Sequence, residues 1–178
     1  MGFPGREALL LKLRERLTEA AARAAPEPPR LALIGAGQEL RGDDAAGIEV
    51  LRQIKAKIST CEHILTLEAG PAPENLTGPL VRFRPHLALI FDAAALDGPP
   101  GDCRLLDAHD LDHSSLGTHA LSLSLFARYL TQQTGCDLAL VGIQPAQMDL
   151  CMPLSPPVST AVRELSALVS ELLLTGDY

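Results

Sequence analysis

The sequence is poor in aromatic side chains: they make up 3% of its 178 residues, and tryptophan is absent. The hydrophobic core must therefore be built mainly from leucine, isoleucine, valine and alanine. Long uninterrupted apolar runs are also absent, so no membrane-spanning helix is expected. Charged residues such as Arg6, Lys12 and Arg14 interrupt the N-terminal apolar residues, so no signal peptide is expected either. These absences predict a soluble, cytoplasmic protein.

Cysteine pairs of the C-x-x-C kind are missing as well. The four cysteines are scattered along the chain, at Cys61, Cys103, Cys136 and Cys151. A structural zinc knot is therefore not expected, and this usage is typical of a reducing compartment. The chain also lacks an excess of positive charge. Its net charge of −7 disfavours nucleic acid and anionic membranes as partners.

What the sequence does contain is an alternation of apolar runs with helical patterns. Strands are expected at residues 31–34, 64–67, 87–91 and 138–143, with a shorter edge strand at 103–106. Helices are expected at residues 6–24, 44–58, 119–133 and 156–174. This order predicts a single α/β domain with a twisted, mostly parallel sheet and helices on both faces.

Two regions are expected along the chain. Residues 1–30 form a helical arm followed by a proline-containing linker, and residues 31–178 form the α/β domain. The arm carries an apolar stripe that includes Leu9, Leu13 and Leu17, so we expect it to pack against its own chain. The helix at 119–133 is expected to bury Leu121, Leu125, Phe126 and Tyr129.

The glycine-rich turn at residues 35–40 resembles a dinucleotide-binding loop. Leu40 stands where the fingerprint needs its third glycine, and Asp43 and Asp44 occupy the entrance of the next helix. Their negative charge would repel a phosphate, so a nucleotide site is not expected. We interpret the glycines as residues that permit a tight turn, which orients the residues that follow.

Three separate segments place metal-ligating residue types where an open α/β sheet binds ligands. Asp43 and Asp44 follow the first strand, Asp92 ends a later one, and His119 begins a helix directly after Thr118. With one acid of the 43–44 pair, these segments offer two carboxylates and an imidazole. The alternative is structural: one acid of the 43–44 pair caps the helix, Asp92 caps the next turn, and the histidine only packs.

Other candidates are weaker. His109 and His113 have the i, i+4 spacing of metal ligands on a helix, but they lie in a polar segment more typical of a solvated loop. Ser114 and Ser115 lack the G-x-S-x-G context of an exposed nucleophile.

Five short motifs resemble those of the hydrogenase maturation endopeptidases, in the same order along residues 31–174. They lie at residues 33–44, 72–75, 90–93, 118–119 and 142–145. The Gly-Ile-Gln-Pro motif at 142–145 resembles the branch of the hydrogenase 3 type. The sequence departs from the family at Gln38, where asparagine is usual, and at Ala45, where glycine is common in this branch.

This resemblance implies a phosphorylase/hydrolase-like α/β fold and a maturation-protease domain over residues 31–178. It implies an endopeptidase that removes the C-terminal extension of a [NiFe] hydrogenase large-subunit precursor after nickel insertion. The family's metal-binding residues fall on Asp44, Asp92 and His119, with Asp44 and Asp92 also catalytic and Asp43 or Asp92 as the candidate base. The nickel is expected to come with the substrate, and zinc or cadmium can replace it in a crystal.

Two alternatives stay open at this point. One is an independent hydrolase that keeps its own zinc or manganese. The other is a non-enzymatic protein that checks the metal site of a partner. For a specific protease, residues 70–80 and 107–118 are expected to flank the cleft, to be mobile without substrate and to contact the large subunit.

Overall fold

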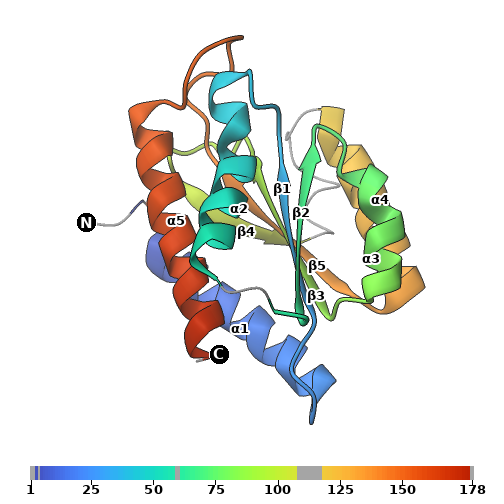
Figure 1. Ribbon diagram of the computed structural model, residues 1–178. Coiled ribbons are helices and arrows are strands. Elements are labelled where there is room, and N and C mark those ends of the chain that lie inside the picture. Colours follow the sequence, from blue (N-terminus) through green and yellow to red (C-terminus); the bar gives the residue numbers. More distant parts are fainter. Residues whose placement is uncertain (1–2, 4, 59–60, 108–117, 177–178) are drawn as a thin grey trace.

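The computed structural model describes residues 3, 5–58, 61–107 and 118–176 (Figure 1). Five strands form one sheet, and their bounds are β1 Leu31–Ala36, β2 Ile64–Gly70, β3 Leu87–Ala93, β4 Cys103–Asp107 and β5 Asp137–Ile143. The strand order is β2-β1-β3-β5-β4. Only β4 runs antiparallel, and it lies at the edge beside β5. The expected mostly parallel sheet and its short edge strand are confirmed.

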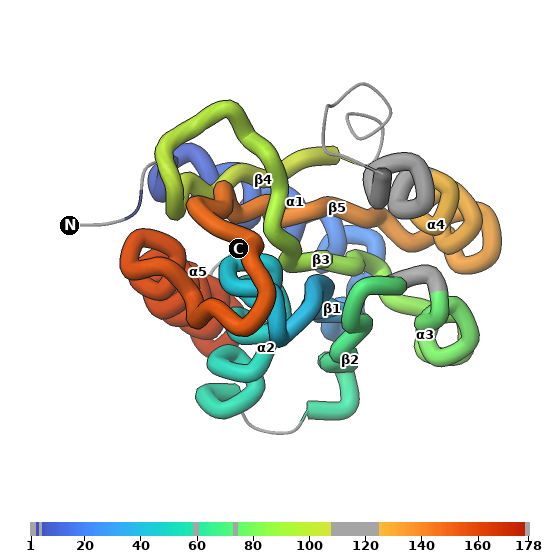
Figure 2. The backbone as a smooth tube through the Cα atoms, turned by 90° about the horizontal axis from the view of Figure 1, so that it is seen from above, coloured from blue at the N-terminus to red at the C-terminus, as the bar shows by residue number. Residues whose placement is uncertain are grey.

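Helices cover both faces of this sheet, as expected. Their bounds are α1 Arg6–Ala24, α2 Ala46–Lys57, α3 Thr77–Phe83, α4 Thr118–Thr134 and α5 Pro156–Thr175, with short 3-10 helices η1 Gly42–Ala45 and η2 Pro73–Leu76. Figure 2 shows α2 and α5 on one side of the sheet and α3 and α4 on the other. Every helix in the described part of the chain is too short or too polar to span a lipid bilayer.

The core consists of two layers because alternate strand residues face opposite sides of the sheet. Leu31 and Leu33 of β1 pack in the layer under α1, α2 and α5. Ala32 and Ile34, which alternate with them, pack in the layer under α3 and α4. Both faces of β1 are buried along its whole length, which explains why its sequence is a continuous apolar run.

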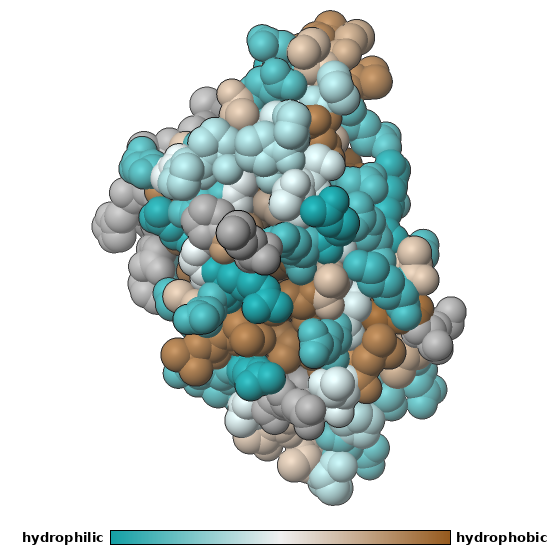
Figure 3. Space-filling view, turned by 90° about the vertical axis from the view of Figure 1, so that its left-hand side faces the viewer, coloured by the Kyte–Doolittle hydropathy of each residue, from teal (hydrophilic) through white to brown (hydrophobic). Residues whose placement is uncertain are grey.

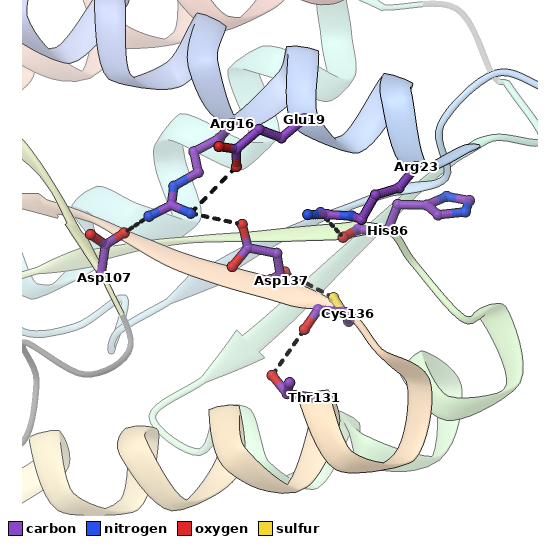
Figure 4. A network of polar contacts seen from close by, with 8 residues as sticks. All are labelled: Arg16, Glu19, Arg23, His86, Asp107, Thr131, Cys136 and Asp137. Atoms are coloured by element: carbon purple, nitrogen blue, oxygen red, sulfur yellow. Dashed lines mark hydrogen bonds and ion pairs between the residues drawn. The ribbon is translucent and has the colours of Figure 1, made fainter. Parts of the chain in front are cut away.

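Helix α1 is part of this core. Leu9, Leu13 and Leu17 are buried in the same layer as α2 and α5, so the expected packing of the arm on its own chain is confirmed. Arg16, on the same helix, reaches Asp107 at the end of β4 and Asp137 at the start of β5, the latter at 3.1 Å (Figure 4). One arginine thus joins the helix to both members of the antiparallel strand pair.

The sequence analysis missed one helix, and one local prediction was wrong. Residues 77–83 form helix α3, which the sequence did not indicate, because this stretch is short and contains a glycine and a proline. In α4, Leu125 and Tyr129 are 57% and 47% exposed rather than buried. This helix carries apolar residues around much of its circumference, and the sheet buries the side that contains Phe126 and its neighbours Ala127 and Leu130.

Candidate active site at the carboxyl edge of the sheet

The predicted site residues come from segments that meet at one edge of the sheet. Strands β1 and β3 are parallel neighbours, so η1, which follows β1, lies beside the end of β3, where Asp92 is the next-to-last residue. Helix α4 precedes β5 and runs back across the sheet, so that it begins at this same edge (Figure 1). The topology therefore brings Asp44, Asp92 and the first turn of α4 to one end of the molecule.

Gly37 lies between the two acidic residues. Its φ of +119° is a backbone conformation that other residues rarely adopt, and its N–H donates to the carbonyl of Gly70 at 2.9 Å. A Cβ at this position would lie 1.8 Å from the carbonyl oxygen of Asp44 and 3.7 Å from Oδ1 of Asp92. The glycine thus lets the chain pass directly between the η1 backbone and the Asp92 carboxyl.

Asp92 has an altered acidity because of this setting. Burial, and after it the nearby charge of Asp44, raise the pKa of its carboxyl to about 7. One hydrogen bond from the N–H of Ala93, at 2.8 Å, acts in the opposite direction. Two carboxyl groups that disfavour each other's charge are a suitable place for a cation, which would relieve the repulsion. The donor chemistry of Asp44 and Asp92 therefore fits a divalent metal.

His119 lies in the first turn of α4, next to Thr118, but its side chain is outside the described part of the structure. Within the described residues, no group of three or more histidine, cysteine, aspartate or glutamate side chains is arranged to hold a metal. The structure thus brings together two of the three predicted ligands. The third, His119, stays a prediction.

Asp43 has a different role from its neighbour. It is fully buried, and its Oδ2 accepts hydrogen bonds from the N–H groups of Ala146 and Gln147, at 2.8 and 3.0 Å. Its Oδ1 accepts another from the N–H of Ser155 at 2.6 Å. These three partners of Asp43 all lie in residues 146–155 and not in the helix that follows it, so the capping alternative is wrong for Asp43.

Asp43 is also excluded as the catalytic base, because both of its carboxylate oxygens accept hydrogen bonds. A carboxylate that accepts three backbone hydrogen bonds inside the protein cannot reach a water molecule at the surface. Its function is structural: it closes the loop at residues 146–155 against η1. Asp92 is the remaining candidate for the base among the two that the sequence offered.

Gln144 is a contributor that the sequence did not single out for a role. Its Oε1 accepts a hydrogen bond from the N–H of Leu96 at 2.6 Å, and its backbone exchanges hydrogen bonds with Gly101 and Asp102. These contacts hold the segment after β3 against the end of β5. A glutamine directly after a buried strand was the available signal, because a polar side chain there needs partners.

The structure describes the cysteines but not the weaker histidine and serine candidates. His109, His113, Ser114 and Ser115 lie outside the described residues. All four cysteines are free. Cys103 and Cys136 are buried, and burial raises the pKa of each thiol to about 12, so they act as core residues rather than nucleophiles.

Comparisons with known proteins show to which protein family this chain belongs. Residues 48–172 match the HycI family of hydrogenase maturation proteases. A relative from Methanocaldococcus jannaschii is 30% identical over 155 residues, which cover 82% of this chain and 91% of that protein. The hydrogenase 3 maturation protease of Escherichia coli K12 is 29% identical over 131 residues, or 73% of this chain and 82% of that protein.

A solved structure agrees with these sequence matches. The [NiFe] hydrogenase maturation protease HycI from Thermococcus kodakarensis KOD1 superimposes with a TM-score of 0.75 at 31% identity, over 85% of this chain and 97% of that one. The chain described here belongs to the family of hydrogenase maturation proteases. Its activity is that of an endopeptidase, a hydrolase of peptide bonds.

Proposed function

We propose that this protein removes the C-terminal extension of a [NiFe] hydrogenase large-subunit precursor in the cytoplasm, after nickel has been inserted. The pairing of Asp44 with Asp92 at the carboxyl edge of the sheet carries the proposal. A like-charged pair with one raised pKa is costly in an empty site and favourable beside a cation. Family membership supplies the reaction, and this pair supplies a means to recognise nickel.

Asp44, Asp92 and His119 are the residues that would hold the nickel carried by the substrate. Carboxylate and imidazole ligands suit a divalent ion of intermediate hardness such as Ni²⁺. A cation held next to a peptide carbonyl or a water molecule polarises it for hydrolysis. Three ligands from the protein leave coordination positions for the substrate's own groups.

Asp92 acts as the base in this proposal. With a pKa of about 7, its carboxyl is partly protonated at neutral pH and takes up a proton poorly. A nearby cation lowers that pKa and converts the group to a carboxylate, which can accept a proton from the attacking water. The water oxygen bonds to the carbonyl carbon, the C–N bond breaks, and the proton passes to the leaving amine. Nickel in the substrate would thus permit cleavage.

The test compares two forms of the same precursor. Purified protein is incubated with nickel-loaded and nickel-free large-subunit precursor, and loss of the C-terminal extension is followed by mass spectrometry. We expect cleavage of the nickel-loaded form alone. Equal cleavage of both forms, or cleavage of neither, contradicts the proposal.

Metal analysis separates this proposal from a hydrolase with a metal of its own. The protein is purified without added nickel, and its metal content is measured before any substrate is present. We expect less than stoichiometric metal. One zinc or manganese per chain, with cleavage independent of the substrate's nickel, indicates the independent hydrolase instead.

A further inference from the structure

Exposed apolar side chains gather beside the candidate site. Eight large apolar side chains in the described part of the chain are exposed, and four of them lie in two loops, 38–41 and 146–153. These four, which we call the apolar tip, are Leu40, Met148, Leu150 and Met152, with exposed fractions of 64%, 39%, 66% and 43%. Figure 3 shows hydrophobic atoms at the uppermost end of the molecule, where Figure 1 places the loop that follows β5.

The two loops form one surface, although about a hundred residues separate them in the sequence. The N–H of Cys151 donates to the carbonyl of Leu40 at 2.7 Å, and Nε of Arg41 donates to the carbonyl of Met148. Gly42 approaches the second loop so closely that a Cβ there would lie 2.9 Å from the carbonyl oxygen of Gln147. The two loops that carry the exposed apolar side chains are therefore held against each other.

Buried Asp43 makes this surface rigid. Its carboxylate binds the N–H groups at both ends of the second loop, those of Ala146 and Gln147 and that of Ser155. The next residue, Asp44, belongs to the acidic pair of the site. Since adjacent residues anchor the tip and form the site, the tip is continuous with the site and keeps a constant position relative to it.

An ordered apolar surface of this kind is suited to binding because little conformational entropy is lost when it is covered. Its extent indicates the kind of partner. Four side chains about half exposed amount to roughly a few hundred Å², the range of a functional patch on a monomer. A stable dimer would need roughly 800 Å² from each copy. A transient contact with a substrate fits the tip better than a second copy of the chain.

We propose that the apolar tip binds an apolar segment of the protein substrate, close to the peptide bond that the enzyme cuts. The inference rests on the proposed function for the identity of that substrate. Leucine provides apolar area, and the flexible, polarisable methionine side chains adapt to a partner's shape. The tip recognises the polypeptide, whereas Asp44 and Asp92 respond to its nickel.

The test replaces single exposed leucines. Leu40→Gln and Leu150→Gln alter the tip, and Leu11→Gln and Leu174→Gln are matched controls, since those leucines are 70% and 63% exposed on α1 and α5. Binding to the nickel-free precursor, which is not expected to be cut, is measured by isothermal titration calorimetry. Circular dichroism and thermal melts confirm that each variant folds.

Each tip variant should weaken binding about 10-fold, the factor that burial of one leucine side chain typically provides. The controls should change binding less than about two-fold. With the nickel-loaded precursor, KM should rise by the same factor while kcat stays nearly constant.

The outcomes separate this inference from the proposed function. Equal binding by tip variants and controls overturns the inference, as does a wild-type protein that does not bind the precursor. Dissociation of a wild-type dimer by Leu150→Gln, seen by sedimentation, also overturns it, because a second copy would then cover the tip. Tip-dependent binding without cleavage of either precursor form supports the docking surface and refutes the proposed function alone.

Discussion

At the scale of single residues, neighbouring aspartates have opposite tasks. Asp43 accepts three backbone hydrogen bonds inside the protein, and Asp44 contributes its charge to the pair with Asp92. Asp92 in turn holds a proton to higher pH than an ordinary aspartate because of burial and the charge of Asp44. That shift has a measurable effect on folding stability.

Asp92→Asn should change the pH dependence of unfolding. The folded protein binds the Asp92 proton more tightly than the unfolded chain does, since the pKa is about 7 in the fold and 3.8 in the reference state. The stabilising effect of that proton is complete below about pH 4 and is lost as the pH rises through 7. Relative to wild type, the metal-free variant should therefore gain stability between pH 4 and pH 7, by up to a few kcal/mol.

Urea denaturation at pH 5 and pH 8 in the presence of a chelator measures this difference. Asp97→Asn, at an exposed position, serves as the control. Cleavage of the nickel-loaded precursor should fall at least 100-fold in Asp92→Asn, in line with the loss of a general base. A stability difference that is the same at both pH values would contradict the raised pKa.

Gly37→Ala tests whether the backbone at residue 37 must fit closely between Asp44 and Asp92. The new Cβ would overlap the carbonyl of Asp44, so η1 must move, in addition to the strain of a positive φ. Gly135→Ala is the matched control, because Gly135 also has a positive φ (+72°) but no atom within 4 Å of an added Cβ. We expect the control to lose about 1 kcal/mol of stability and Gly37→Ala at least twice that, with loss of cleavage. Equal effects in thermal melts would show that the overlap is unimportant.

At the scale of elements, α1 is attached to the sheet by both apolar and ionic contacts. Its buried leucines pack in the layer under α2 and α5, and Arg16 pairs with Asp107 and Asp137 from a half-buried position. The two carboxylates raise the pKa of Arg16 against its burial, so the guanidinium stays charged. The pairing fixes the register of the helix on β4 and β5.

Arg16→Met should lower the free energy of unfolding by about 1–2 kcal/mol, since three partly screened ion pairs, with Asp107, Asp137 and Glu19, are lost and the apolar stem is kept. Arg14→Met, at an exposed position on the same helix, is the control and should cost less than about 0.5 kcal/mol. The difference between the variants should shrink in 1 M salt, where exposed charges are screened. Equal stabilities in urea denaturation would mean that only the leucines hold α1.

At the scale of the whole molecule, parallel strand order gathers distant segments at one edge. The end of β2 with η2, the start of α4 and the apolar tip all lie at this edge. A folded protein substrate that reaches Asp44 and Asp92 must contact several of them. Substrate binding should therefore be visible in more than one connection at once.

Hydrogen exchange with and without nickel-loaded precursor measures this. We expect protection of residues 70–80 and 107–118, as the sequence predicts for the substrate-contacting segments, and of the apolar tip. Helix α1, on a different part of the molecule, should be unaffected and serves as the internal reference. Protection confined to α1 would contradict this placement of the substrate.

The sequence by itself determined the elements whose signal is local. Continuous apolar runs predicted the buried strands, because a strand that is buried on both faces needs an apolar residue at every position. Apolar residues at i, i+4 spacing predicted α1 and α5, because these helices bury one stripe of side chains. The candidate acids could also be found, since Asp44 and Asp92 follow strand ends, where α/β sheets bind ligands.

Tertiary structure decided what depends on distant partners. Which side of α4 is buried follows from the sheet beneath it, so Phe126 is covered and Leu125 is not. Asp43 and Asp44 are the same residue type at consecutive positions, and no local pattern distinguishes them. Their roles differ because backbone N–H groups of residues 146–155 donate to the carboxylate of Asp43, whereas the charge of Asp44 acts on Asp92. Hydrogen bonds and charges between segments so far apart in the chain exist only once the fold brings them together.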